Sequence, residues 1–116
     1  MGDRDLIIQT VLDYVEGWYG ADIERMDRAL YSTLSKRRIT PEGEVWESTR
    51  DWMVDATKKG QGSIEHPEKG KKEIAILDMT QTMASVKLVS EMFDDYIHLA
   101  KVSGNWVIVN VLWDYH

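Results

Sequence analysis

The stretch DDYIHLAKVSGNWVIVNVLWDYH, residues 94–116, decides the fold of this chain. On both sides of residues 103–105 the side chains alternate with the period of two that is typical of β-strands. Gly104 can supply the positive φ that a three-residue hairpin loop needs. Counting outward from such a loop places His98 opposite Asn110. The segment therefore predicts a β-hairpin with these two polar residues side by side on one face.

Upstream of this hairpin the sequence predicts helices first and strands afterwards. Apolar residues recur at helical spacing after Asp3, a second short helix follows the capping residue Asp22, and a capping pattern at residues 48–51 opens a third. Residues 60–72 are polar and glycine-punctuated, which predicts a mobile loop able to close over a pocket. The expected helices span residues 3–19, 22–30 and 48–58, and the expected strands span 34–39, 73–79 and 84–92. This order is typical of an α+β fold, here one domain over residues 1–116.

The composition excludes several classes of function. Twenty acidic and 14 basic residues give a formal charge of −6, which argues against nucleic acid or an anionic membrane as a partner. The absence of cysteine excludes disulfides, thiolate metal sites and a cysteine nucleophile. No secretory leader is recognisable, and no apolar run approaches the roughly 20 residues that a membrane span needs. We therefore expect a cytoplasmic protein.

Three motifs carry a family resemblance. Together with the hairpin, GWY at residues 17–19 and ASVKL at residues 84–88 resemble the nuclear transport factor 2-like (SnoaL-like) superfamily, in particular its branch described as "putative lumazine-binding". The resemblance implies a cone-shaped, curved antiparallel sheet wrapped around three N-terminal helices, with an internal pocket. Because the superfamily includes isomerases, dehydratases, hydrolases and non-catalytic association domains, the fold by itself does not give the function.

The predicted pocket gathers polar and aromatic side chains on the inner sheet face. His98, Asn110 and Tyr14 are the catalytic candidates, because an imidazole can exchange protons, an amide can fix its tautomer and a phenol can donate to a developing oxyanion. The alternative is that Asn110 only satisfies a buried histidine in a packed core. The ligand-binding candidates are Trp18 from the first helix, Tyr96 and Trp106 from the hairpin, and Arg37.

The basic run at residues 36–38 alternates along a strand, so that Arg37 points to one face and Lys36 and Arg38 to the other. An inward member could bind an anionic group of a ligand. The alternative is a solvated edge that prevents strand pairing with other chains. The sequence does not decide which of the three faces the pocket.

The last strand predicts a dimer. Both of its faces are largely apolar, and three short helices can cover only one side of a curved sheet. We therefore expect Val109, Val111 and Trp113 to form the centre of a homodimer interface on the outer face, as the resemblance also implies. The alternative is an apolar outer face that stays exposed in a monomer.

These observations favour a small-molecule-binding protein. It could be a cofactor-free acid–base enzyme of the isomerase, dehydratase or hydrolase type, and the sequence leaves open whether it catalyses a reaction. The alternative is a non-catalytic dimerisation module. His66 and His116 lack ligand spacing to acidic residues, so we expect no metal, and nothing in the sequence implies a cofactor.

Overall fold

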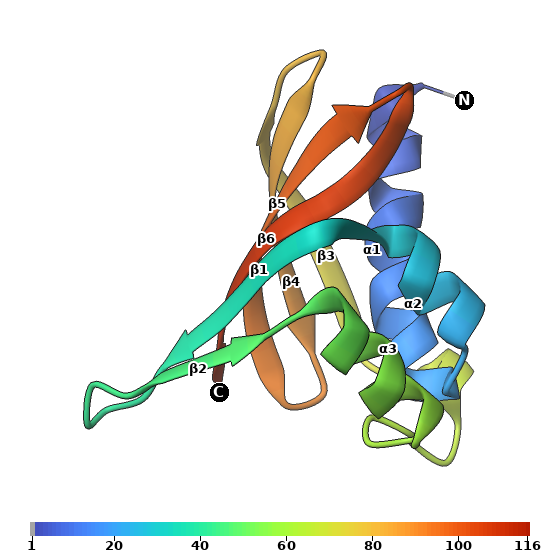
Figure 1. Cartoon of the computed structure of the whole chain (residues 1–116). Coiled ribbons are helices and arrows are strands. Elements are labelled where there is room, and N and C mark those ends of the chain that lie inside the picture. Colours follow the sequence, from blue (N-terminus) through green and yellow to red (C-terminus); the bar gives the residue numbers. More distant parts are fainter. Residues whose placement is uncertain (1) are drawn as a thin grey trace.

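The computed structural model describes residues 2–116, in which three α-helices lie against one face of a six-stranded sheet (Figure 1). The helices precede the main meander in the chain, so the architecture is α+β, as the sequence predicts. The helices are α1 (Asp3–Gly20), α2 (Ile23–Ala29) and α3 (Arg50–Lys58), with a 3-10 turn η1 (Pro67–Lys69). The strands are β1 (Leu30–Ile39), β2 (Val45–Ser48), β3 (Lys72–Met79), β4 (Met83–Ser90), β5 (Phe93–Val102) and β6 (Asn105–Tyr115).

The sheet is curved, open and mixed. Its strand order is β2-β1-β6-β5-β4-β3, and every neighbouring pair is antiparallel except β1 and β6, which run parallel. The first strand therefore lies beside the last one. The predicted antiparallel order of the last four strands, β3 to β6, is confirmed, but the sheet is not antiparallel throughout as expected, and the prediction also missed β2. No helix within residues 2–116 combines the length and apolar character that crossing a membrane requires.

Local capping signals in the sequence set the helix boundaries. The Asp22 carboxylate accepts a hydrogen bond from the Arg25 amide at 3.2 Å, and the Thr49 hydroxyl accepts one from the Trp52 amide at 3.1 Å. Each bond satisfies a backbone N–H that the first helical turn leaves free. Both predicted starts are confirmed. The expected cap at Asp3 is wrong, because the N-cap of α1 is Gly2.

An ion-pair cluster ties α1 to α2. Asp13 is only 5% exposed, and it accepts hydrogen bonds from Arg25 at 2.9 Å and from Arg28 at 3.0 Å. Burial raises the pKa of Asp13, but the two guanidinium groups outweigh this effect, so the pKa lies below its ordinary value. The folded state thus favours the ionised carboxylate, and the cluster holds α2 on the helix that carries the first residues of the site.

The terminal hairpin differs from the predicted register in two ways. Its turn has two residues, Ser103 and Gly104, with φ of 50° and 82°, so Val102 pairs with Asn105. This is the backbone of a two-residue turn with both φ values positive. An irregularity at Val109 then adds one residue to β6, which restores the predicted pairing of His98 with Asn110.

The two-residue turn reverses the predicted faces of β5, and the added residue reverses those of β6 after Val109. On β5, Ile97 and Leu99 are fully buried against the helices, which places His98 on the opposite face. On β6, Val111 is 1% exposed. Trp113 also points inward, and only Val109 of the three expected interface residues belongs to the outer face. The expected dimer centre at Val111 and Trp113 is therefore wrong, because both side chains belong to the interior.

Candidate functional site

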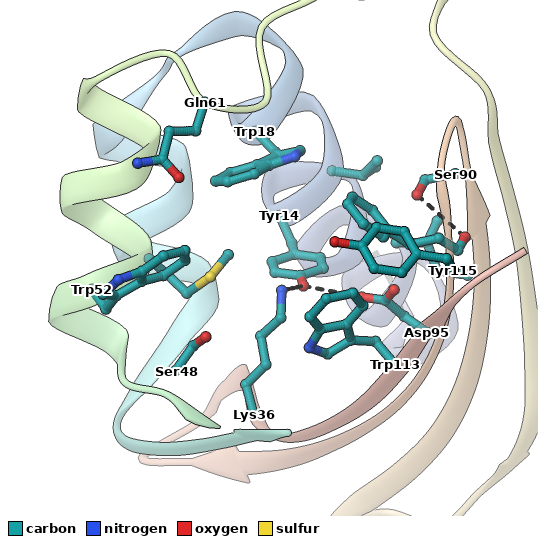
Figure 2. Close-up of a pocket in the computed structure, with 14 residues that line it drawn as sticks. Tyr14, Trp18, Lys36, Ser48, Trp52, Gln61, Ser90, Asp95, Trp113 and Tyr115 are labelled. Carbon is teal, nitrogen blue, oxygen red and sulfur yellow. Dashed lines mark hydrogen bonds between the residues drawn. The ribbon is translucent and has the colours of Figure 1, made fainter. Parts of the chain in front are cut away.

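A cavity of about 230 Å³ lies between the concave face of the sheet and helices α1 and α3 (Figure 2). Its wall is largely apolar, with a few polar groups that point inward, which is the usual composition of a small-molecule site. Six of the 14 lining residues are aromatic. The lining residues are Tyr14, Val15, Trp18, Lys36, Ser48, Trp52, Met53, Gln61, Leu88, Ser90, Phe93, Asp95, Trp113 and Tyr115.

The Tyr14 hydroxyl is the centre of the polar part of the wall. It donates a hydrogen bond to Asp95 Oδ2 at 3.0 Å and accepts one from Lys36 Nζ at 2.5 Å. Figure 2 shows the three side chains converging from different elements. Tyr14 comes from α1, Asp95 from β5 and Lys36 from β1. The site therefore forms only when the helix and both strands come together.

Burial shifts the pKa of each member of this triad toward its neutral form. Burial raises the pKa of the Asp95 carboxyl, although the Lys36 charge and the Tyr14 hydrogen bond oppose the shift. Burial lowers the pKa of Lys36, against the attraction of Asp95. The pKa of Tyr14 lies well above its ordinary value because of burial and the adjacent Asp95 charge. Tyr14 is therefore a hydrogen-bonded phenol, while Asp95 and Lys36 are more ready to exchange protons than exposed groups of the same type.

The side-chain amine of Lys36 is surrounded mainly by aromatic rings. Its Nζ lies 5.0 Å from the centroid of the Tyr14 ring and 5.7 Å from that of Trp113. Within residues 2–116 it forms no ion pair, and its one hydrogen bond goes to Tyr14. Aromatic faces attract a cation more weakly than a carboxylate does. The ammonium form of Lys36 is therefore stabilised by two aromatic rings and by Asp95, which Lys36 reaches only through the Tyr14 hydroxyl.

Trp113 adds a second unused donor to the cavity wall. Its indole Nε1 is buried and has no hydrogen-bond partner among the described residues. The ring is held edge-on by Phe93, at 5.1 Å between centroids, and by Tyr115, at 5.3 Å. A buried N–H without an acceptor costs about 1–3 kcal/mol. Lys36 and Trp113 together give this wall an excess of donors.

The basic run divides as its alternation predicts, with Lys36 as the member in the cavity wall. Arg37 points outward and pairs with Glu47 at 3.0 Å, so its assignment to the ligand site is wrong. Arg38 points inward but is engaged by Asp114, at 2.8 Å, and by the faces of Trp46 and Tyr115, at 4.7 and 4.9 Å. Only Lys36 retains donors for a ligand.

The other predicted site residues separate into two groups. Tyr14 and Trp18 line the cavity as expected. His98, Asn110 and Tyr96 lie on the outer sheet face, where Asn110 Nδ2 contacts His98 Nδ1 at 3.2 Å. His98 lines an open depression of about 470 Å³ there.

Trp106 points inward, but it lies at the far end of the sheet. Its Nε1 donates to Asp3 at 3.1 Å, so it fixes the start of α1 and does not line the cavity.

Sequence reasoning missed Asp95. Its signal was available, because Asp95 follows the same period of two as Ile97 and Leu99 and so belongs to the more apolar face of β5. A single acidic residue on the apolar face of a strand is a candidate for an inward-facing side chain with a shifted pKa. No group of three or more His, Asp or Glu side chains that could hold a metal ion occurs in residues 2–116.

Comparison with known proteins identifies the family of the chain. The model of the family described as "putative lumazine-binding" matches residues 2–114. The chain belongs to this family. No curated protein matches the chain.

Solved structures show the fold of the family member described here. An NTF2-like protein of unknown function from Shewanella baltica OS155 is 22% identical, with a TM-score of 0.77 over 98% of this chain and 94% of that chain. An NTF2-like protein of unknown function from Silicibacter pomeroyi DSS-3 is 20% identical, with a TM-score of 0.73 over the full length of both chains. A protein described as a "putative scytalone dehydratase" from Novosphingobium aromaticivorans DSM 12444 is 15% identical, with a TM-score of 0.67 over 98% of this chain and 84% of that chain. The fold is NTF2-like, as the sequence motifs predict.

Proposed function

We propose that the chain binds a small, flat molecule that carries a carbonyl or anionic oxygen, with Lys36 as its electrostatic anchor. The observation that carries this proposal is the convergence of Lys36, Tyr14 and Asp95 on the wall of an otherwise apolar cavity. A buried ammonium group is costly unless its charge is compensated. A ligand oxygen beside Nζ would supply that compensation.

The aromatic lining favours a planar ligand. Trp18, Trp52 and Trp113 offer ring faces from two helices and the sheet, and aromatic rings gain about 0.5–1.5 kcal/mol per stacked or edge-on pair. The volume of about 230 Å³ lies below the roughly 300–1,000 Å³ of drug-sized sites. A molecule of one or two rings therefore suits the cavity best.

The relatives support the same class of ligand. The family name refers to lumazine, a flat, two-ring heterocycle with carbonyl oxygens. One neighbour of the same fold is described as a dehydratase, which supports acid–base chemistry as the type of reaction if the chain is an enzyme. Asp95 suits that chemistry, because Oδ2 accepts the Tyr14 hydroxyl and Oδ1 makes no hydrogen bond within residues 2–116. Asp95 Oδ1 would take a proton next to a carbonyl whose oxygen is held by Lys36.

Calorimetric titration with lumazine and with benzoate tests the proposal. We expect both to bind the wild-type protein, and we expect Lys36→Met to weaken benzoate binding by about tenfold or more, because a charge-assisted hydrogen bond contributes roughly 1.5–3 kcal/mol. Lys87→Met is the matched control. Lys87 Nζ also lies over a tyrosine ring, 5.4 Å from the centroid of Tyr96, but on the outer face. Equal benzoate affinity of the two variants would contradict the proposal, as would a wild-type protein that binds neither probe.

Self-association through the outer face is a second proposed function. The observation that favours it is a set of large apolar side chains that are about half exposed or more on the strands of that face: Leu77, Met83, Tyr96 and Leu112. Contiguous apolar patches on a sheet face mark protein–protein contacts more often than free surface. The two functions use opposite faces of the sheet, so they can coexist.

A further inference from the structure

We propose that Lys36 is a nucleophilic amine that forms an imine with small aromatic aldehydes in the cavity, an inference that rests on the small-molecule site proposed above. The amine lines a mostly apolar cavity, its Nζ contacts a phenol at 2.5 Å, and no ion pair within residues 2–116 holds it. An amine attacks a carbonyl only in its neutral form, and lysines in such surroundings are the ones that serve as Schiff-base formers.

Comparison with the other lysines shows why the reaction would be selective. Lys59, Lys71, Lys72 and Lys101 each lie between 2.8 and 3.4 Å from a carboxylate oxygen. A carboxylate at that distance stabilises the ammonium form and removes the nucleophile. The side chain of Lys36 meets ring faces instead.

The surroundings of Lys36 include one influence that raises its pKa and one that lowers it. Asp95 on β5 favours the ammonium form, whereas burial lowers the pKa of Lys36. Arg38, two residues along the same face of β1, pairs with Asp114 at 2.8 Å, so its charge is compensated by that carboxylate. Tyr14 on α1 and Tyr115 on β6 are the other titratable groups that line the cavity.

The proposed step balances without an oxidant or reductant. The lone pair of Nζ attacks the aldehyde carbon, a C–N bond forms, and the carbonyl π pair moves to the oxygen, which takes a proton to give a carbinolamine. A second proton transfer converts the hydroxyl to water, which leaves as the nitrogen pair forms the C=N bond. The Tyr14 hydroxyl touches Nζ and is itself bonded to Asp95, so the two can pass protons between the nitrogen and the departing oxygen.

Reductive trapping tests the inference on the intact protein. Benzaldehyde and sodium cyanoborohydride at neutral pH would convert any imine to a stable benzylamine, and peptide mass mapping would locate the label among the eight lysines of the chain. We expect Lys36 to be labelled at least about ten times faster than Lys87, because burial lowers the pKa of Lys36 and so raises the fraction of its neutral amine. Lys36→Met should remove the fast phase and Lys87→Met should leave it unchanged.

Two outcomes separate this inference from the proposed function. Benzoate cannot form an imine, so benzoate binding together with equal labelling of Lys36 and Lys87 would overturn the imine alone. Fast labelling of Lys36 without benzoate or lumazine binding would support the imine and contradict the electrostatic anchor. Because the wild-type peptide map by itself decides the question, a Lys36→Met variant that fails to fold does not affect the test.

Discussion

At the scale of single residues, Asp95 is the one acidic residue among those that line the cavity. It is 4% exposed, and burial raises its pKa above the ordinary 3.8 in spite of Lys36 and Tyr14. A buried acid with a raised pKa binds its proton more tightly in the folded state than in the unfolded state. Its contribution to stability is therefore complete below pH 3.8 and is lost as the pH rises through the folded-state value.

The first prediction follows from this loss of stability with rising pH. Asp95→Asn keeps an acceptor for the Tyr14 hydroxyl but removes the titration. The free energy of unfolding of the variant minus that of the wild type should increase as the pH rises from about 4 toward neutrality. Urea denaturation of both proteins at a series of pH values measures this difference. A difference that is constant or that falls with pH would show that Asp95 is not the buried acid described here.

The observed position of His98 differs from its predicted position in the pocket. The sequence made it the proton-exchanging group of the pocket, but it lies on the outer face beside Asn110. We therefore expect His98→Gln to leave lumazine and benzoate affinity within about twofold of the wild type, and to change the free energy of unfolding by no more than about 0.5 kcal/mol, as for other exposed substitutions. Calorimetric titration and urea denaturation measure the two quantities. A tenfold loss of affinity would show that His98 takes part in ligand binding.

At the scale of elements, the loop after α3 forms part of the cavity wall and packs directly against α1. Gly62 lies so close to Trp18 that a Cβ at this position would overlap the indole ring. Gln61, beside it in the loop, lines the cavity, and Trp18 lines it from α1. The predicted mobility and lid role of residues 60–72 remain a prediction, but the contact shows how the loop and the cavity wall are coupled.

Gly62→Ala tests that coupling. The added methyl group must displace Trp18 or the loop, and overpacking of this kind typically costs about 1–3 kcal/mol. We expect a lower urea midpoint and weaker benzoate binding. Gly20→Ala is the control, because the nearest atom to its Cβ would be Pro67 Cβ at 4.0 Å, an ordinary contact. A Gly62→Ala variant that matches the Gly20→Ala variant in both measurements would disprove the tight contact.

At the scale of the whole molecule, the helices cover one face of the sheet and leave the other with large apolar side chains. Leu112 is 50% exposed and Tyr96, its partner across the strands, is 47% exposed. Burying the exposed half of several such side chains would contribute roughly 1 kcal/mol each before the costs of association. The homodimer predicted from the sequence thus remains a prediction, with a centre at Leu112 and Tyr96 in place of Val111 and Trp113.

Leu112→Asp should convert that dimer to a folded monomer, because a carboxylate at the centre of an apolar contact is buried without a partner. Ile23→Asp is the control, since Ile23 is 39% exposed at the start of α2, away from the sheet. Light scattering after size-exclusion chromatography measures the mass, and circular dichroism confirms the fold. A wild-type protein that is monomeric at high micromolar concentration would rule the interface out.

The sequence by itself determined the fold class, the three helices and five of the six strands. Caps at Asp22 and Thr49, helical spacing over residues 3–19 and strand alternation over residues 94–116 depend on interactions within a few residues of the chain, so local patterns reveal them. The pairing of His98 with Asn110 and the inward position of Tyr14 and Trp18 were also predictable.

Only the tertiary structure decided which face is inside and which residues meet there. One added residue at Val109 changes the face of every later side chain in β6, and no local sequence pattern predicted this irregularity. The parallel contact of β1 with β6 joins segments far apart in the sequence, and it brings Lys36 to Tyr14 and Asp95. Three residues from three elements converge because helix and sheet bury their apolar faces against each other, which is a property of the assembled core and not of any one segment.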